Sequence, residues 1–332
     1  MSDRSEATAS SAMPGVAGGP IGAPAPRAPR LRHRRGDGWV AVAFLAPGLI
    51  GFVLFILTPL FGSAFISLFD WKLFGSPDFI GFENYVKLFR DPTFYTVLGN
   101  TLIFAVVYTA LNLFVALTIS LWLNTRMKAA GAWRVIFFLP VITPMVANAL
   151  VWRLLLSQDG LVNSMLATVG IDGPNWLSDS AWALPSVIAM SVWQSFGYNV
   201  IVLSAGLSAI PKELLEASRI DGTSAWQRLR FIILPLLSPS LFFCSTMTMI
   251  GAFQVFVQPL FLTQGGPGES TNTFVLYLYR NGFVFDRLGY ASALAWILFL
   301  VVMLITALQF VGQRRWAVSY THLRAHETKA NL

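Results

Sequence analysis

The sequence carries little charge. Only 12% of its 332 residues are Asp, Glu, Lys or Arg, while 55% are hydrophobic. A typical soluble domain has about 25% charged residues, and a fold of this size could not bury so much apolar surface in its own core. The same composition excludes disordered, collagen-like and coiled-coil chains. A polytopic membrane protein remains, in which lipid covers the apolar surface.

Cysteine, histidine and catalytic motifs are also scarce. The single cysteine, Cys244, excludes an internal disulfide and a cysteine metal site. The three histidines, His33, His322 and His326, lie in the polar ends. The sequence has no P-loop, H-E-x-x-H or G-x-S-x-G pattern. We therefore expect no catalytic residue, metal or cofactor on this chain, and the energy for any active transport would have to come from another subunit.

Six charge-free runs are long enough to cross a bilayer core of about 30 Å, which takes about 20 helical residues. We expect an all-α bundle with spans in Trp39–Phe69, Pro92–Thr125, Val135–Trp152, Ser180–Pro211, Phe231–Gly268 and Leu288–Gln313. The third run has 18 residues, so one straight helix of about 27 Å would just suffice. No acid, lysine or histidine lies inside these runs, which disfavours an ion-coupled carrier and an enzyme with a lipid-linked substrate.

Lysine and arginine are distributed unevenly between alternate loops. Seventeen lie in the N-terminal tail, in loops 124–134 and 211–230, and after residue 313, whereas six lie in the other three loops. Cytoplasmic loops carry the excess of Lys and Arg, so both termini are predicted to be cytoplasmic. This topology accounts for the net charge of +7, and we expect no nucleic-acid partner.

The two ends of the chain differ from the apolar middle. Residues 1–38 are rich in Ala, Pro, Gly, Ser and Arg and are predicted to be a disordered basic cytoplasmic tail. A signal peptide is disfavoured because the polar part is long and the first apolar run spans fully. Residues 39–313 are predicted to form the transmembrane domain and 314–332 a second cytoplasmic tail. From Ser319 the composition changes abruptly, which fits either a native tail or a cloning scar.

The loop 211–235, between the fourth and fifth runs, has the pattern of two helices joined by a turn. Its signals are a first-turn proline, helix formers, a turn dipeptide and a cap for a second helix ending near Pro235. In chain order these are Pro211, Lys212–Arg219, Asp221-Gly222, and Thr223 or Ser224. The loop also carries charges of both signs and the apolar residues Leu214, Leu215, Trp226 and Leu229. A solvated amphipathic loop and a docking element for a cytoplasmic partner both fit this pattern.

One pattern in this loop is specific. Glu216-Ala217-Ser218, then Gly222 after three residues, then Ile232-x-Leu234-Pro235 after nine more, resembles the EAA loop of ABC-importer permeases. The family usually has alanine where this chain has Ser218. The resemblance implies a coupling helix in a cleft of the ATP-binding subunit, where Glu216 pairs with a basic group. It also implies that Gly222 allows the sharp turn and that Asp221 stabilises the turn or the next helix. The docking residues implied are Leu214, Leu215, Glu216, Ala217, Ser218, Asp221 and Gly222.

The resemblance extends over about Trp39 to Val311 and is similar to the carbohydrate-uptake branch, which imports oligosaccharides and glycerol phosphate. It is carried by Phe137-Phe138-Leu139-Pro140, Val151-Trp152-Arg153, Gly160-Leu161-Val162-Asn163, Asn175-Trp176-Leu177, Ala205-Gly206-Leu207, Thr263-Gln264-Gly265-Gly266-Pro267 and Gly289-Tyr290-Ala291-Ser292-Ala293. It implies a type I importer permease in a bacterial cytoplasmic membrane. The partners implied are a second permease subunit in a heterodimer, two subunits that bind ATP and Mg²⁺, and an extracytoplasmic solute-binding protein.

Polar side chains inside the spans are candidates for the solute pathway. They are Asn148, Gln194, Tyr198, Asn199, Gln254 and Gln258, and their depths converge on one cavity in the outward half. Hydrogen bonds between helices are the alternative role for each of them. Amides and aromatic rings suit a neutral sugar, whereas glycerol phosphate would need a cation along a dry pathway. A glycerol-phosphate permease and an ATP-independent facilitator remain the alternatives.

Overall fold

The computed structural model describes residues 37–72, 75–125 and 129–313. The predicted tails lie outside these residues, apart from Asp37 and Gly38, which begin the first helix. The chain divides into two compact units, residues 1–56 and residues 57–332. The first unit contains α1 (Asp37–Phe52), and a π-helical segment, η1 (Val53–Leu57), leads to α2 (Thr58–Ile66).

Apart from its loops and turns, the described part of the chain is helical, with one pair of very short strands. The elements after α2 run in the following order. They are β1 (Phe69–Asp70), β2 (Asp78–Phe79), α3 (Glu83–Arg90), α4 (Pro92–Leu123), α5 (Ala130–Ile142), α6 (Met145–Leu155), α7 (Leu161–Thr168), α8 (Ser180–Ser208), α9 (Lys212–Ile220), α10 (Ala225–Arg228), η2 (Leu229–Ile233), α11 (Leu234–Phe253), α12 (Val257–Leu262), α13 (Phe274–Tyr279), η3 (Arg280–Val284) and α14 (Leu288–Gln313).

Within the described residues, five helical stretches are long and apolar enough to cross a membrane. They are Val42–Ile66, Pro92–Leu123, Ser180–Ser208, Ala225–Phe253 and Leu288–Gln313. Each falls within or overlaps one of the predicted runs. The pair α5 and α6 passes the same test together, but it bends by 93° at the break. The all-α class and the number of apolar segments are therefore confirmed.

The expectation of a single straight helix over Val135–Trp152 is wrong. The chain stops being helical at Thr143, whose backbone is extended with φ −77° and ψ 143°. Pro144 follows directly, and a proline disfavours the α conformation of the residue before it. The apolar run is continuous in the sequence, so hydropathy alone does not detect this bend.

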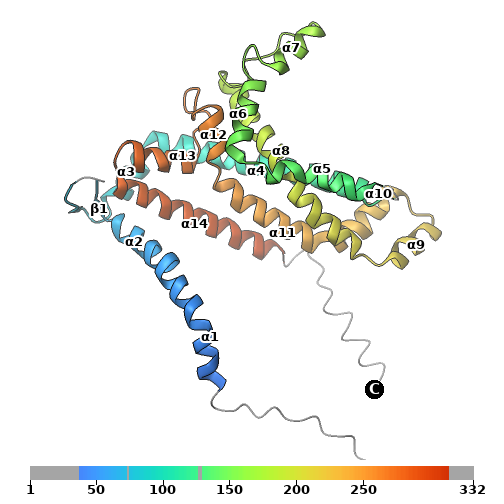
Figure 1. Cartoon of the computed structure of the whole chain (residues 1–332), viewed down its shortest axis with the longest axis horizontal. Helices are drawn as coiled ribbons and strands as arrows, with labels where there is room; N and C mark the ends of the chain where they lie inside the picture. The colour runs from blue at the N-terminus through green and yellow to red at the C-terminus, as the bar shows by residue number, and fades with distance from the viewer. Residues whose placement is uncertain (1–36, 73–74, 126–128, 314–332) are drawn as a thin grey trace, which may run out of the picture. The chain divides into compact units, whose positions relative to one another are not determined.

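Helix α8 is at the centre of the second unit, where it packs against α4, α5 and α11 (Figure 1). More of α8 is buried than of any other candidate span. Two glycines allow the close approach: a Cβ on Gly197 would lie 2.1 Å from the Phe137 carbonyl oxygen of α5, and one on Gly206 would lie 2.5 Å from Ser240 Oγ of α11. Small residues at helix crossings are the usual means of bringing membrane helices together.

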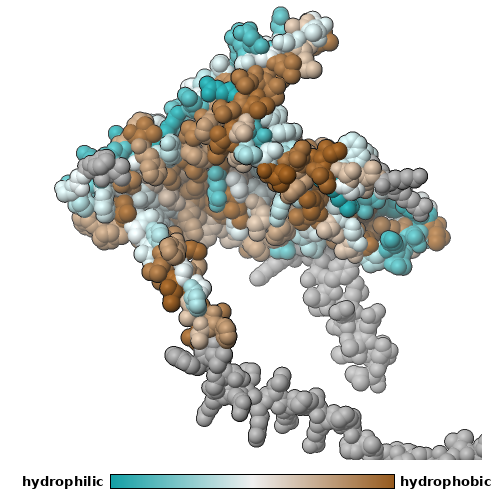
Figure 2. Space-filling model, in the orientation of Figure 1, coloured by the Kyte–Doolittle hydropathy of each residue, from teal (hydrophilic) through white to brown (hydrophobic). Residues whose placement is uncertain are grey.

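Large apolar side chains remain exposed on the outside of the second unit. On α5, Val135, Ile136, Leu139 and Ile142 are exposed, and α14 exposes several more. Figure 2 shows the resulting apolar surface over α5 and along α6. An exposed apolar surface of this extent would be unstable in water and is normal for helices that face lipid or another membrane subunit.

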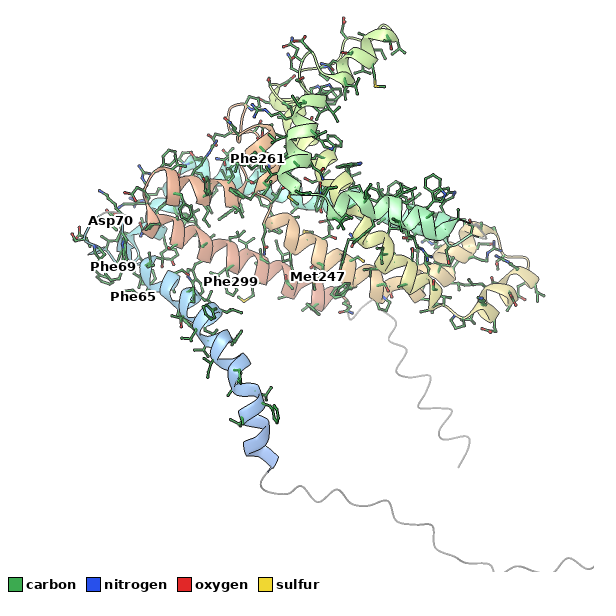
Figure 3. The ribbon with its side chains drawn as sticks, viewed as in Figure 1. Phe65, Phe69, Asp70, Met247, Phe261 and Phe299 are labelled. Carbon is green, nitrogen blue, oxygen red and sulfur yellow. The ribbon has the colours of Figure 1, made fainter. Side chains whose placement is uncertain are left out.

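The two strands form a small pair, with Phe69 opposite Phe79. The rings of Phe65 and Phe69, labelled in Figure 3, have centroids 4.7 Å apart, and Phe69 also meets Phe79 at 5.2 Å. Asn84 Nδ2 of α3 donates hydrogen bonds to the carbonyl oxygens of Ser67 and Phe69 at 2.9 Å. These bonds tie α3 to the end of α2 and to β1.

Candidate functional site

The loop 211–235 forms two helices joined by a tight turn, as predicted. Helix α9 ends at Ile220, and Gly222 follows with φ +73°. The Thr223 backbone N–H and hydroxyl both donate to the Ser218 carbonyl oxygen, at 3.1 and 2.6 Å. Ser224 then caps α10: its side chain accepts from Gln227 N, and the Gln227 side chain accepts from Ser224 N. Ser224, rather than Asp221 or Thr223, therefore caps the second helix.

The second helix does not end near Pro235, contrary to the expectation. The helical stretch continues from Ala225 to Phe253 and becomes a membrane span. A proline inside a helix removes one backbone hydrogen bond and would normally break it. Here the preceding segment η2 has π-helical spacing, and Pro235 occupies the first turn of α11, where its missing N–H costs little.

The two faces of α9 differ in their surroundings. Ser218 is buried, and Leu215 packs against the core cluster that α4, α8 and α11 share. Leu214 is exposed on the other side, and Ile220 is 86% exposed. Of the two predicted docking leucines, only Leu214 is therefore free to meet another protein. Figure 1 places α9 at the end of the bundle away from α12 and α13.

Two acidic residues of the loop, Glu216 and Asp221, have no partner among the described residues. Glu216 and Asp221 are exposed, and within the described residues neither carboxylate forms an ion pair or a hydrogen bond. Ala217 is exposed between Glu216 and the buried Ser218. A Cβ on Gly222 would meet nothing within 4 Å, so space does not explain the glycine. Its positive φ does, because glycine adopts that conformation without strain.

Asn148 and Gln194, from α6 and α8, are joined at the break between α5 and α6. Asn148 Nδ2 donates to Gln194 Oε1 and to Thr143 Oγ1 at 2.5 Å. Gln194 Nε2 donates to the carbonyl oxygens of Pro140 at 2.6 Å and Thr143 at 3.3 Å. The bend leaves these two carbonyls without their usual helical donors, and the Gln194 amide donates to both. The Thr143 hydroxyl also donates to the Pro140 carbonyl oxygen at 2.6 Å, whereas Asn148 bonds only side chains.

Asn199 belongs to a second polar cluster between α4, α8 and α11. Its Nδ2 donates to Asn112 Oδ1 at 2.7 Å and to Thr248 Oγ1 at 2.8 Å. Asn112 Nδ2 also donates to Ser195 Oγ at 2.9 Å, and Tyr108 shares a 2.6 Å hydrogen bond with the same hydroxyl. Tyr108 and Asn112 were not among the predicted pathway residues. Their spacing of four residues places both polar side chains on one face of α4, which is a signal that the sequence carries.

Gln254 and Gln258 lie elsewhere, at an open cavity of about 490 Å³. Tyr108, Phe104 and Phe256 also line this cavity. Gln258 is almost buried, and its side chain makes no hydrogen bond with the described residues. Tyr198 stands apart from both clusters and is 45% exposed. The six predicted pathway residues therefore occupy several places: two meet at the break, one lies in the polar cluster, two line the cavity, and Tyr198 stands alone.

A further cluster, around Asp91 at the start of α4, was not predicted from the sequence. Asp91 Oδ1 accepts from Thr93 N at 2.9 Å, and Oδ2 accepts from the hydroxyls of Tyr277 and, at 3.1 Å, Tyr290. Burial alone would raise the pKa of Asp91, but the hydrogen bonds from Tyr277 and Thr93 outweigh it and hold the pKa below its ordinary value. Burial and the bond to Asp91 raise the pKa of Tyr277. One carboxylate thus ties α4 to α13 and α14.

Comparisons with known proteins agree with this architecture. The family model for binding-protein-dependent transport system inner membrane components matches residues 115–318. A probable ABC transporter permease, YurN of Bacillus subtilis (strain 168), is 38% identical over 273 residues, which are 80% of this chain and 93% of the relative. The lactose transport system permease LacF of Rhizobium radiobacter is 34% identical, covering 84% of this chain and 94% of its own length.

A solved structure supports the same conclusion. The crystal structure of a bacterial ABC transporter involved in the import of the acidic polysaccharide alginate contains a similar chain, with a TM-score of 0.73 and 26% identity. The match covers 84% of this chain and 96% of that chain. The chain described here therefore belongs to the family of binding-protein-dependent transport system inner membrane components: it is a multi-pass permease subunit of an ABC transporter, whose ATPase is a separate subunit.

Proposed function

We propose that this chain forms one half of the translocation pathway of a sugar importer and receives the ATP-driven movement through α9. Its partners would be a second permease subunit, two ATP-binding subunits that carry ATP and Mg²⁺, and an extracytoplasmic binding protein. Two relatives support a sugar: one is a lactose transport system permease, and another, 32% identical, is an arabinooligosaccharides transport system permease. The alginate transporter has also been solved in complex with a substrate-bound periplasmic protein.

The exposed face of α9 is the observation that carries the coupling role. Within the described part of the chain, Glu216 is a charge without a partner, and Leu214 and Ile220 are apolar side chains left exposed. An unpaired carboxylate beside exposed apolar residues is the composition of a protein interface, in which the charge selects a basic partner and the apolar groups supply contact area. The loop would be cytoplasmic, as would both termini, because the Lys and Arg excess lies on that side.

Glu216→Ala tests this role. We expect ATP-driven sugar uptake into vesicles to fall about 100-fold, because truncating one partner of a buried charge pair at an interface costs about 2–5 kcal/mol. The chain should stay in the membrane at its normal level, since Glu216 is exposed and makes no hydrogen bond or ion pair with the described residues.

Glu213→Ala is the matched control. Glu213 is also acidic and exposed on α9, but it lies outside the EAA pattern, so uptake should remain within about twofold. Equal uptake by the wild type and the Glu216 variant would contradict the docking role. Uptake that persists without ATP and without any ATPase in the purified complex would favour a facilitator.

We also propose that the solute is a neutral sugar. Among the described residues, none that lines the cavity beside Gln254 and Gln258 is charged. Amide groups and the rings of Phe104, Tyr108 and Phe256 suit sugar hydroxyls and C–H faces, whereas a phosphate dianion would be left without a counter-charge. The same vesicles, offered neutral oligosaccharides and glycerol phosphate in parallel, decide between these two substrates.

A further inference from the structure

A groove lies between α9, α10 and the ends of α4 and α8. It has a volume of about 550 Å³, and its apolar wall includes Leu207, Ile210 and Leu215. The last residues of α4 and α8 contribute to this wall, so the groove lies where two candidate spans end. Such a position corresponds to the boundary between hydrocarbon and water. We call it the arginine groove, after its two charged residues, Arg219 and Arg228.

The described residues that line this groove do not balance its charge. Among the described residues that line it, none is acidic. Arg228 donates one hydrogen bond to the Thr223 carbonyl oxygen at 3.0 Å. The Arg219 guanidinium makes no hydrogen bond or ion pair with the described residues. Two arginines that share an apolar-walled groove without a carboxylate are a favourable place for an anion, because guanidinium groups bind phosphate strongly through paired N–H donors.

We propose that the arginine groove binds one anionic phospholipid of the cytoplasmic leaflet. Its phosphate would lie between Arg219 and Arg228, and an acyl chain would follow the wall of Leu207 and Ile210. Basic pockets between the cytoplasmic ends of membrane helices are typical sites for anionic headgroups. The apolar wall favours a lipid over free phosphate, since a phosphate ion alone would leave that wall against water.

The proposal has a consequence for coupling and rests on the cytoplasmic placement proposed above. Arg219 lies on α9 and Arg228 on α10, so one phosphate would bridge the two arms of the turn at Gly222. A bridge of this kind would hold α9 at a fixed angle to the start of the following span. We therefore expect the bound lipid to increase the fraction of ATP hydrolysis that is coupled to uptake.

Native mass spectrometry of the whole transporter complex provides the test. Complexes stripped of lipid are incubated with phosphatidylglycerol or with phosphatidylcholine, and the bound lipid is counted. We expect one phosphatidylglycerol for each copy of this chain, bound at least tenfold more tightly than phosphatidylcholine. Arg219→Gln should weaken phosphatidylglycerol binding about tenfold, which is the value of one charge-assisted hydrogen bond.

Arg230→Gln is the matched control. Arg230 lies in η2, directly after α10, and is exposed, but it does not line the groove. Its guanidinium instead lies 5.9 Å from the centroid of the Phe231 ring. Its loss should leave lipid binding unchanged. Arg219 makes no hydrogen bond with the described residues, so its variant should still fold, and Arg219→Lys should recover part of the binding.

Three results would overturn the proposal: equal binding of the two lipids, unchanged phosphatidylglycerol binding by Arg219→Gln, or binding of inorganic phosphate as tight as that of the lipid. Lipid that binds the permease subunits alone but not the whole complex would assign the groove to a protein interface instead. The measurement needs neither sugar nor ATP. The lipid site can therefore fail while the importer function stands, and the importer function can fail while the lipid site stands.

Discussion

At the residue scale, the polar side chains of the spans are distinguished by whether their hydrogen bonds are already made. The Gln194 amide donates to two backbone carbonyls and accepts from Asn148. The Asn199 amide donates to Asn112 and Thr248. Gln258 has no side-chain partner among the described residues and lines a cavity. A bound sugar would gain a hydrogen bond from Gln258 without breaking one, whereas Gln194 would first have to release the backbone.

Gln194→Ala and Gln258→Ala should therefore have different effects. The first leaves the Thr143 carbonyl without a donor among the described residues and removes one of three donors to the Pro140 carbonyl, so we expect about 2 kcal/mol of lost stability and an unchanged KM for sugar. The second should leave stability unchanged and raise KM about fivefold. Thermal unfolding in detergent and uptake kinetics measure the two effects. A raised KM with normal stability in Gln194→Ala would instead place that amide at the sugar.

Gly222 makes a second residue-scale prediction. Its φ of +73° is costly for an L-residue, by about 1–2 kcal/mol, while a Cβ would meet no atom within 4 Å. Asn tolerates this conformation and a β-branched residue does not. We expect Gly222→Asn to keep most of the uptake activity and Gly222→Val to lose it. If both variants are inactive, a requirement for space at a partner surface, rather than backbone geometry, explains the glycine.

At the scale of the elements, two prolines that look alike in the sequence have opposite outcomes. Pro144 follows an extended Thr143 and separates α5 from α6 by 93°. Pro235 is accommodated, because the π-helical spacing of η2 precedes it and the helix continues. The difference lies in the surroundings. At Pro144, the side chain of Gln194 from α8 donates hydrogen bonds to the carbonyl oxygens of Pro140 and Thr143, which lack their usual helical donors.

The cluster around Asp91 makes a prediction at the same scale, because it joins α4, α13 and α14. Asp91→Asn should lower stability by about 1 kcal/mol at pH 7, since it replaces a charged acceptor of three hydrogen bonds. The pKa of Asp91 is depressed in the folded protein, so its contribution is complete above the ordinary value of 3.8 and is lost as pH falls through the folded pKa.

Thermal unfolding of the wild type and of Asp91→Asn from pH 7 down to about pH 3 measures this contribution. The two curves should converge at the acidic end. Tyr290→Phe, which removes only one donor at 3.1 Å, should have a smaller effect at every pH. A difference between wild type and Asp91→Asn that grows towards acid pH would show that the carboxylate is not a stabilising acceptor.

At the scale of the whole molecule, the uneven distribution of Lys and Arg between loops predicts a membrane topology that can be tested. Val169, after α7, and Ile220, at the end of α9, are both highly exposed and are predicted to lie on opposite sides of the membrane. In intact cells, an impermeant maleimide should label Val169→Cys, and it should label Ile220→Cys only after the membrane is opened. The wild type is the control, because its Cys244 is buried in α11. Labelling of Ile220→Cys from outside would invert the topology.

The sequence by itself determined the features that depend on neighbouring residues. Each span must satisfy its own backbone in lipid, so long charge-free runs located five of the helices, and the dipeptide Asp221-Gly222 located the turn. Only the tertiary structure decided which groups meet. Tyr277 reaches Asp91 across 186 residues, and Asn112 reaches Asn199 across 87. Hydropathy does not detect such pairs, because they join residues far apart in the sequence that meet only when the helices pack. The bend at Thr143 has a local cause in Pro144, but the side chain that donates to the exposed carbonyls, Gln194, comes from α8 and was placed there only by the tertiary structure.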